Sequence, residues 1–166
     1  MTAASEPEFP LFLSQLRSAG VTTPVLAGDA VDSPTTLALG DDAEGLVYAS
    51  AAYPAAGSRL ETFDRDYAAR FGGDPDVEVA PYAATAYEAI TMIAAAIAKA
   101  GSTDGVAVRD ALDGMTEFPG ITGARITLAG ANRIARREVA LIRVEHGKKT
   151  LLKTLRPDQA DVPAPQ

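Results

Sequence analysis

The feature that most constrains this chain is a shortage of strands among alternating helices and strands. Two apolar runs predict short buried strands, at residues 24–27 (PVLA) and 45–50 (GLVYAS), and helical spacing surrounds both. Such alternation predicts an α/β fold with a mostly parallel sheet and flanking helices. Two parallel strands alone cannot cover their own edges or enclose a core. The expected fold therefore needs strands that this half of the sequence does not supply.

Helix signals recur along the chain. Ser58 and Glu61 have the spacing of a capping box, in which two side chains satisfy free backbone N–H groups at a helix start. An alanine-rich segment carries Ile90, Ile93 and Ile97 at helical spacing, and we expect these three to face inward. The expected helices cover residues 8–19, a short turn from 33 to 40, 58–71, 80–100 and 104–113.

The pattern changes toward the C-terminus. A glycine-rich stretch surrounds an expected strand near 124–128. The run REVALIRVEHGKKTLLKTL then predicts two strands joined at a turn around Gly147, which makes a C-terminal β-hairpin. The last residues, DQADVPAPQ, have little to bury and predict a flexible tail.

Composition limits the possible functions. The chain has 166 residues, of which 47% are hydrophobic and 22% charged, as in an ordinary globular domain. A net charge of −7 provides no basic field for nucleic acid. The absence of cysteine excludes thiolate metal sites, disulfides and thiol nucleophiles. The acidic N-terminus does not predict a signal peptide, and no membrane span, metal site, cofactor motif or catalytic set is expected.

Asp29 is the strongest candidate for a functional residue. It directly follows the first apolar strand, and in open α/β sheets ligands lie at the carboxyl ends of strands. A carboxylate there can pair with an ammonium group. The alternative is an Asx-turn, in which the side chain bonds nearby backbone N–H groups. Asp32, by contrast, is expected to belong to the turn that leads into the next helix.

Four further residues are candidates for the same cleft. Backbone groups of Ala30 and Val31 would line it beside Asp29. Tyr53 follows the second strand and Tyr82 begins the long helix, so either could present a ring or hydroxyl to a ligand. For both tyrosines the alternative is a half-buried place in the core or at its rim.

Taken in order, several stretches resemble the later part of the branched-chain amino-acid-binding family of periplasmic solute-binding proteins, the receptors of ABC transporters. The resemblance covers about residues 9–157. The matching stretches are FLSQLRSAGVTTPVLAGDAVDSP, GDDAEGLVYAS, LETFDRDYAARFGGDPDVEVAPYAATAYEAITMIAAAIAKAGSTDGVAVRDAL, FPGITGARITLAGANR and VALIRVEHGKKTLLKTLRP.

The resemblance implies part of a type I periplasmic binding fold, in which two lobes close on a ligand by a hinge motion. It would place residues 9–79 in the second lobe, 80–137 in the first lobe and 138–156 in a hairpin that returns to the second, followed by a tail at 157–166. Most of the first lobe, whose loops hold the ligand's carboxylate in this family, has no counterpart here. By the same resemblance, Asp29 would bind the α-ammonium group of an amino acid.

These features lead to a first hypothesis and two alternatives. The first is a non-catalytic fragment of an ABC-importer receptor for branched-chain amino acids or related small amides, periplasmic or at the cell surface, with a permease as partner. The second is a truncated or split interaction protein that binds no solute alone and needs a complementary chain or a second copy of itself. The third is a small flavodoxin-like enzyme or regulator, disfavoured because no phosphate loop is evident.

Overall fold

The computed structural model describes residues 2, 4–73, 81–123, 125–128 and 135–156. Its helices are α1 (Glu8–Ser18), α2 (Pro34–Leu37), α3 (Arg59–Phe71), α4 (Pro81–Ala100) and α5 (Gly105–Asp113), with short 3-10 helices η1 (Asp29–Val31) and η2 (Gly40–Ala43). Its strands are β1 (Leu26–Ala27), β2 (Val47–Ser50), β3 (Val139–Glu145) and β4 (Lys148–Leu155). The tail expected at 157–166 lies outside the described residues.

The four strands form one mixed sheet in the order β1-β2-β3-β4. β1 and β2 pair in parallel, whereas β2–β3 and β3–β4 are antiparallel, with Tyr48 opposite Ile142. The α/β class is confirmed. The sheet is not mostly parallel, because β3 of the expected hairpin pairs antiparallel with β2. His146 and Gly147 both have positive φ, 53° and 71°, which is the turn that a tight hairpin requires.

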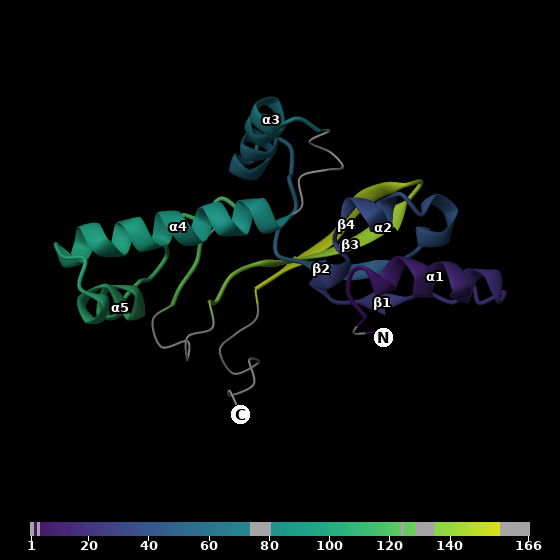
Figure 1. Cartoon of the computed structure of the whole chain (residues 1–166), viewed down its shortest axis with the longest axis horizontal. Coiled ribbons are helices and arrows are strands. Elements are labelled where there is room, and N and C mark those ends of the chain that lie inside the picture. Colours follow the sequence, from purple (N-terminus) through teal and green to yellow (C-terminus); the bar gives the residue numbers. More distant parts are fainter. Residues whose placement is uncertain (1, 3, 74–80, 124, 129–134, 157–166) are drawn as a thin grey trace.

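The first core lies between the sheet and the helices that cover it. Phe9 and Leu13 of α1 are fully buried against Tyr48 of β2 and Ile142 of β3. α1, α2 and the sheet lie together on the right of Figure 1, and we call this unit the sheet body. Because residues from both ends of the chain build this core, the hairpin contributes directly to its stability.

A second unit consists of α4, α5 and residues 115–123 and 125–128, and we call it the helical body. It extends to the left in Figure 1, with its own core around Met92, Ala96 and Ile126. The strand expected near 124–128 is reduced, in the part of this region that the structure describes, to isolated bridges. These join Phe118 to Ile126 and Thr127 to Arg136.

α4 corrects the expected direction of its isoleucines. Ile90 is 66% exposed and Ile93 is 42% exposed, so both face outward, whereas Ile97 is half-buried. The buried residues of α4 are Pro81, Ala84, Glu88, Met92 and Ala96. Because apolar residues surround most of this helix, periodicity alone did not show which side faces the rest of the molecule.

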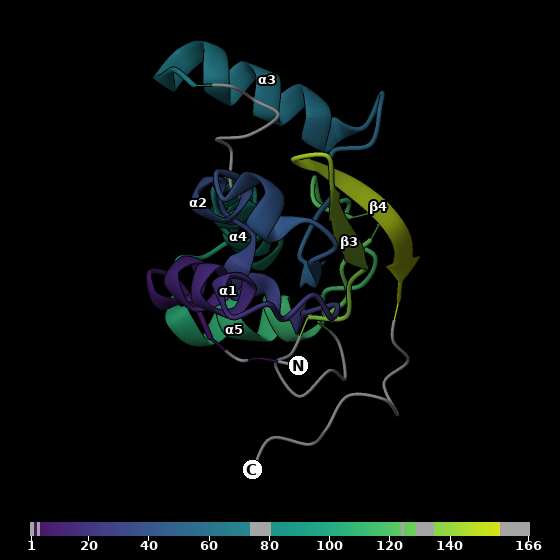
Figure 2. The same ribbon diagram turned by 90° about the vertical axis from the view of Figure 1, so that its right-hand side faces the viewer.

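α3 begins as its capping box predicts. Ser58 Oγ accepts a hydrogen bond from the Glu61 N–H at 3.1 Å, and Glu61 Oε2 accepts one from the Gly57 N–H at 2.6 Å rather than from Ser58. The helix projects away from α1, α2 and α5 in Figure 2, and it meets α4 through the rings of Phe63 and Tyr87, whose centroids lie 5.3 Å apart. Its buried positions are Leu60, Asp64 and Ala68. Among its other large apolar side chains, Phe63 and Tyr67 are half-buried and Phe71 is exposed.

Candidate functional site

Asp29 lies where β1 ends, in the short helix η1, and its side chain is exposed. No hydrogen bond or ion pair from a described residue reaches its carboxylate. Its backbone oxygen accepts a hydrogen bond from the Tyr82 hydroxyl at 3.2 Å. Tyr82 belongs to the first turn of α4, so this contact brings two of the predicted site residues together from the sheet body and the helical body.

The surroundings of Tyr82 are acidic. Burial raises the pKa of the Tyr82 hydroxyl, and the negative charges of Asp29, Asp32 and Glu6 raise it further. Three carboxylates therefore act on one hydroxyl group at the junction of the two bodies. A negative potential of this kind attracts cationic groups and disfavours anionic ones.

Glu6 is held in place by the start of α2. Its Oε1 accepts hydrogen bonds from the hydroxyls of Ser33 at 2.5 Å, Thr35 at 2.6 Å and Thr36 at 3.2 Å. Burial acts to raise the pKa of Glu6, but these hydrogen bonds outweigh it and the pKa is lowered. Glu6 therefore keeps its negative charge at neutral pH.

Asp32 is a buried charge rather than only a turn residue. It is 1% exposed, and it accepts hydrogen bonds from Tyr48 at 3.1 Å and Ser50 at 2.5 Å. Lys149 Nζ of β4 lies 2.7 Å from Asp32 Oδ1. This corrects the assignment of Asp32 to a simple turn, because the side chain points into the sheet body. The ion pair ties the hairpin to the loop that carries Asp29.

Ala30 and Val31 differ in what they can offer. Ala30 is partly exposed beside Asp29, whereas the side chain of Val31 is fully buried in the core of the sheet body. The Val31 carbonyl already accepts a hydrogen bond from the Ser33 N–H at 3.0 Å. Their backbone contribution to a ligand site stays a prediction.

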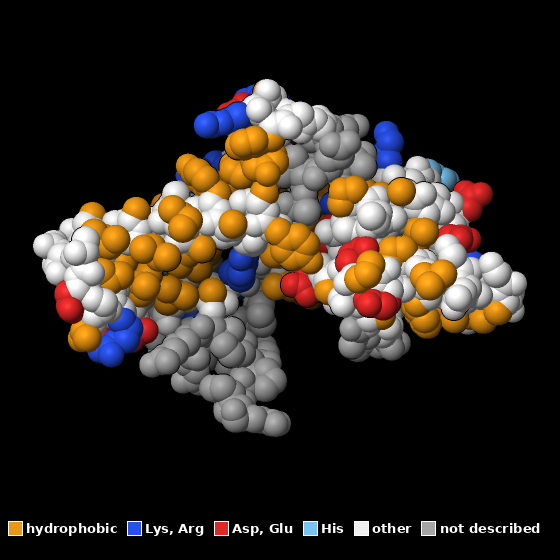
Figure 3. Space-filling view, in the orientation of Figure 1, with side chains coloured by type: hydrophobic (Ala, Val, Ile, Leu, Met, Phe, Trp, Pro, Cys, Tyr) orange, Lys and Arg blue, Asp and Glu red, His pale blue; other side chains and the backbone are white. Residues whose placement is uncertain are grey.

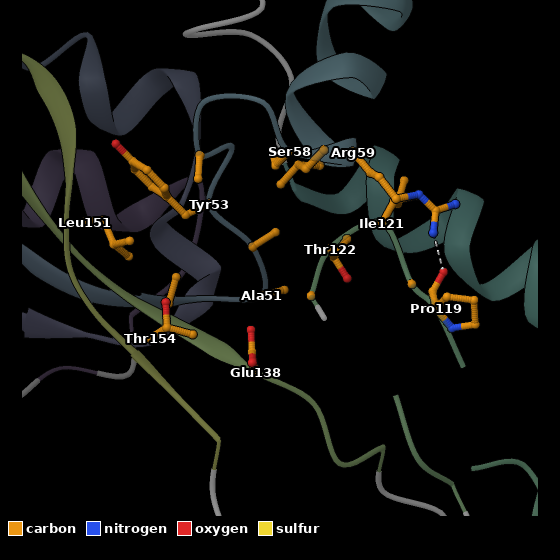
Figure 4. A pocket seen from close by; sticks show the side chains of 16 residues that line it. Ala51, Tyr53, Ser58, Arg59, Pro119, Ile121, Thr122, Glu138, Leu151 and Thr154 are labelled. Carbon is orange, nitrogen blue, oxygen red and sulfur yellow. Dashed lines mark hydrogen bonds between the residues drawn. The ribbon is translucent and has the colours of Figure 1, made fainter. Parts of the chain in front are cut away.

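Tyr53 lies elsewhere. It lines a cavity of about 470 Å³ with Ser58, Arg59 and Glu138, and neither Asp29 nor Tyr82 lines this cavity (Figure 4). The Tyr53 hydroxyl donates a hydrogen bond to the Lys149 carbonyl at 3.4 Å. The structure therefore does not bring Tyr53 together with the other candidates.

Sequence reasoning missed Glu6 and Lys149. Glu6 is 27 positions from its partner Ser33, and no local pattern links them. A partial signal exists for the buried ion pair, because Tyr48 and Ser50 are polar residues on the same face of a short strand. Polar groups on a core face need a partner inside the protein.

Other chemistry finds no support in the described part of the chain. There, no group of three or more His, Cys, Asp and Glu side chains could hold a metal ion. No helix among the described residues is both long and apolar enough to cross a membrane. The site offers the exposed carboxylate of Asp29, which lies beside the Tyr82 hydroxyl and two further acidic residues, Asp32 and Glu6.

Asp64 of α3 is a second buried carboxyl group near Lys149. Asp64 is 6% exposed, and burial raises its pKa from an ordinary value of 3.8 to about 6, although the charge of Lys149 acts in the opposite direction. At neutral pH, α3 therefore carries a buried negative charge at a cost to stability.

We expect Asp64→Asn to change how stability depends on pH. Between about pH 4 and 6 the folded wild type holds a proton on Asp64 that the unfolded chain has lost, so its stability falls as pH rises. The variant does not lose stability in this way, so above pH 6 its free energy of unfolding should exceed that of the wild type by about 1–2 kcal/mol. Urea denaturation at pH 4 and pH 7.5 measures the difference, and an equal gain at both pH values would contradict it.

Comparison with known proteins defines the family of this chain. The sequence model of a family described as periplasmic binding protein matches residues 1–149. The chain belongs to the periplasmic binding protein family. Among solved structures of the family, the chain is similar to the leucine-binding protein LivK of Thermotoga maritima, with 27% sequence identity and a TM-score of 0.80.

Two further structures share the periplasmic binding protein fold. One is LivJ of Streptococcus pneumoniae in complex with isoleucine, at 18% identity and a TM-score of 0.79. The other is a solute-binding protein of R. palustris in complex with benzoate, at 17% identity and a TM-score of 0.74. Both confirm the expected α/β fold of the type I periplasmic binding proteins.

The chain spans less than half the length of these relatives. The match with LivK covers 93% of this chain and 43% of that one, and the figures for the benzoate-bound protein are 93% and 42%. A comparison with curated protein sequences gives no match. The resemblance to part of a periplasmic binding protein is thereby confirmed, while the division into lobes at 9–79, 80–137 and 138–156 stays a prediction.

Proposed function

We propose that this chain is part of an amino-acid receptor of an ABC importer, and that Asp29 holds the ammonium group of the ligand. One observation carries the proposal. The exposed carboxylate of Asp29 stands at the carboxyl end of β1, and Tyr82 of the helical body donates to the same residue at 3.2 Å. Ligands of α/β proteins bind at this end of the strands.

The charges around Asp29 favour a cationic group. Asp29, Asp32 and Glu6 all act on Tyr82, and the charge of Asp32 is balanced by Lys149 at 2.7 Å. Asp29 has no such counter-charge among the described residues. A charge-assisted hydrogen bond to an ammonium group contributes about 1.5–3 kcal/mol. LivK, a leucine-binding protein at 27% identity, supports an amino acid as the ligand class.

The remaining parts of the proposal follow from the family. The protein would bind and deliver a solute rather than transform it, without a cofactor, and its partner would be the importer's permease. Its place would be the periplasm or the cell surface. The solute class would be branched-chain amino acids or related small amides, held as the two lobes of the whole receptor close.

A second candidate function is supported by the outer face of α4. Ile90, Ile93 and Tyr87 are exposed on it, and Ala86, Ala89 and Ala94 are exposed beside them. Figure 3 shows hydrophobic side chains gathered over α4 and α5. Because the relatives are more than twice as long as this chain, the polypeptide that corresponds to their remaining length is the occupant that fits this face. In this alternative, the chain binds such a complementary polypeptide and no solute by itself.

A titration with leucine tests the first proposal. Half a cleft should bind weakly, with a Kd of about 1 mM or above, which corresponds to no more than about 4 kcal/mol. We expect leucine to shift the backbone amide NMR signals of residues 28–31 in the wild type and not in Asp29→Asn. Asp41→Asn, which removes an exposed carboxylate from η2, is the matched control and should behave as wild type.

A further inference from the structure

A buried polar cluster lies where the two bodies meet, away from Asp29. Glu88 of α4 is 3% exposed. Its carboxylate accepts hydrogen bonds from the Thr122 N–H at 3.0 Å and the Thr122 hydroxyl at 2.6 Å. Arg137 NH1 lies 3.5 Å from Glu88 Oε2. A glutamate on a largely apolar helix thus binds groups from outside that helix.

Arg137 extends the cluster into the sheet body. It stands two residues before β3, and its NH2 group donates to the Ala51 carbonyl at 2.8 Å, directly after β2. The same NH2 group also contacts the Thr122 hydroxyl. Arg137 Nε is buried and makes no hydrogen bond to a described residue. The guanidinium therefore relies on the Glu88 carboxylate and the Ala51 carbonyl as acceptors. Loss of either contact would leave more of its N–H donors unsatisfied.

The cluster packs closely against the backbone of Gly120. A Cβ atom on Gly120 would overlap Glu88 Oε1 and the side chain of Ile126. Next to it, the Arg59 guanidinium at the start of α3 donates to the Pro119 carbonyl at 2.8 Å, as Figure 4 shows. Residues 119–122 are thereby fixed from two sides.

We propose that Glu88, Thr122 and Arg137 form a clasp that fixes the angle between the sheet body and the helical body. The clasp joins α4 and the Thr122 loop of the helical body to the ends of β2 and β3 in the sheet body. A buried ion pair adds little net stability but can select one arrangement of the groups around it. The clasp goes beyond the proposed function, because it needs no ligand. It would set the angle at which Tyr82 meets Asp29.

The absence of cysteine from the sequence permits a direct distance measurement. Spin labels on Val106→Cys in α5 and Lys148→Cys at the hairpin report on the two bodies, since both positions are exposed. With the clasp intact, pulsed EPR should give a single narrow distance distribution. Glu88→Gln should shift or broaden it. The Thr122 amide, which donates to Glu88, should exchange with solvent about 10- to 100-fold faster.

Two further variants keep the outcome decisive. Thr122→Val keeps the shape of the side chain and removes only its hydroxyl, so it tests the clasp if Glu88→Gln fails to fold. Asp110→Asn is the control, because it removes a carboxylate from an exposed ion pair on α5 and should leave the distances unchanged. An unchanged distance distribution in both clasp variants overturns the proposal, whether or not the backbone amide of residue 122 exchanges faster. Because no ligand is present, the result is independent of whether leucine binds.

Discussion

Lys149→Met is expected to destabilise the chain by about 3–5 kcal/mol, which makes it one of the two largest effects we foresee. The substitution leaves Asp32, 1% exposed, without the cation that lies 2.7 Å from its carboxylate. Hydrogen bonds from Tyr48 and Ser50 remain and should hold the loss near the lower end of this range. The free energy of unfolding from urea denaturation at pH 7.5 measures it.

The neighbouring lysine is the matched control. Lys148 is exposed at the start of the same strand, and Lys148→Met should change stability by less than about 0.5 kcal/mol. Equal small losses in the two variants would mean that Asp32 is not a buried charge. If instead the contrast appears, the hairpin is energetically tied to the loop that carries Asp29.

The second large effect is the contrast between two isoleucines. Ile142 of β3 is fully buried, and Ile142→Ala should cost about 2–5 kcal/mol through lost burial and the cavity left behind. Ile90 of α4 is 66% exposed, and Ile90→Ala should cost about 0.5 kcal/mol or less, since alanine is also the better helix former.

This pair also bears on the outer face of α4. A loss at Ile90 comparable with the loss at Ile142 would mean that another polypeptide or a second copy already covers the face in solution. Sedimentation of the wild type over a range of concentrations would then identify a second copy. A small loss of stability in Ile90→Ala, together with a monomeric wild type, would mean that no other polypeptide covers this face when the chain is alone in solution.

Much of the fold could be predicted because its signals are local. The start of α3 depends on Ser58 and Glu61, three residues apart, and the tight turn of the hairpin depends on His146 and Gly147. The position of Asp29 also follows locally, from its place beyond an apolar strand, separated from it only by Gly28. In each case the residues that determine the structure are neighbours in the chain.

The rest depended on partners that are distant in the chain. The inward direction of Glu88 follows from Arg137 and Thr122, the latter 34 positions away, and so α4 turns Ile90 outward against the expectation from periodicity. The sheet is mixed because the hairpin comes back to pair with β2. Local patterns carry no information about such pairings, which require the whole chain to be folded.

The most direct test of the central claim compares three ligands of similar shape by amide NMR titration of the full chain. Leucine and 3-methylbutylamine both carry an ammonium group, whereas 4-methylpentanoate keeps the apolar group and the carboxylate and lacks the ammonium. We predict that leucine and 3-methylbutylamine shift the signals of residues 28–31 in the wild type but not in Asp29→Asn. We predict that 4-methylpentanoate shifts these signals in neither protein. Equal shifts with all three ligands, or shifts that survive in Asp29→Asn, would contradict the role proposed for Asp29.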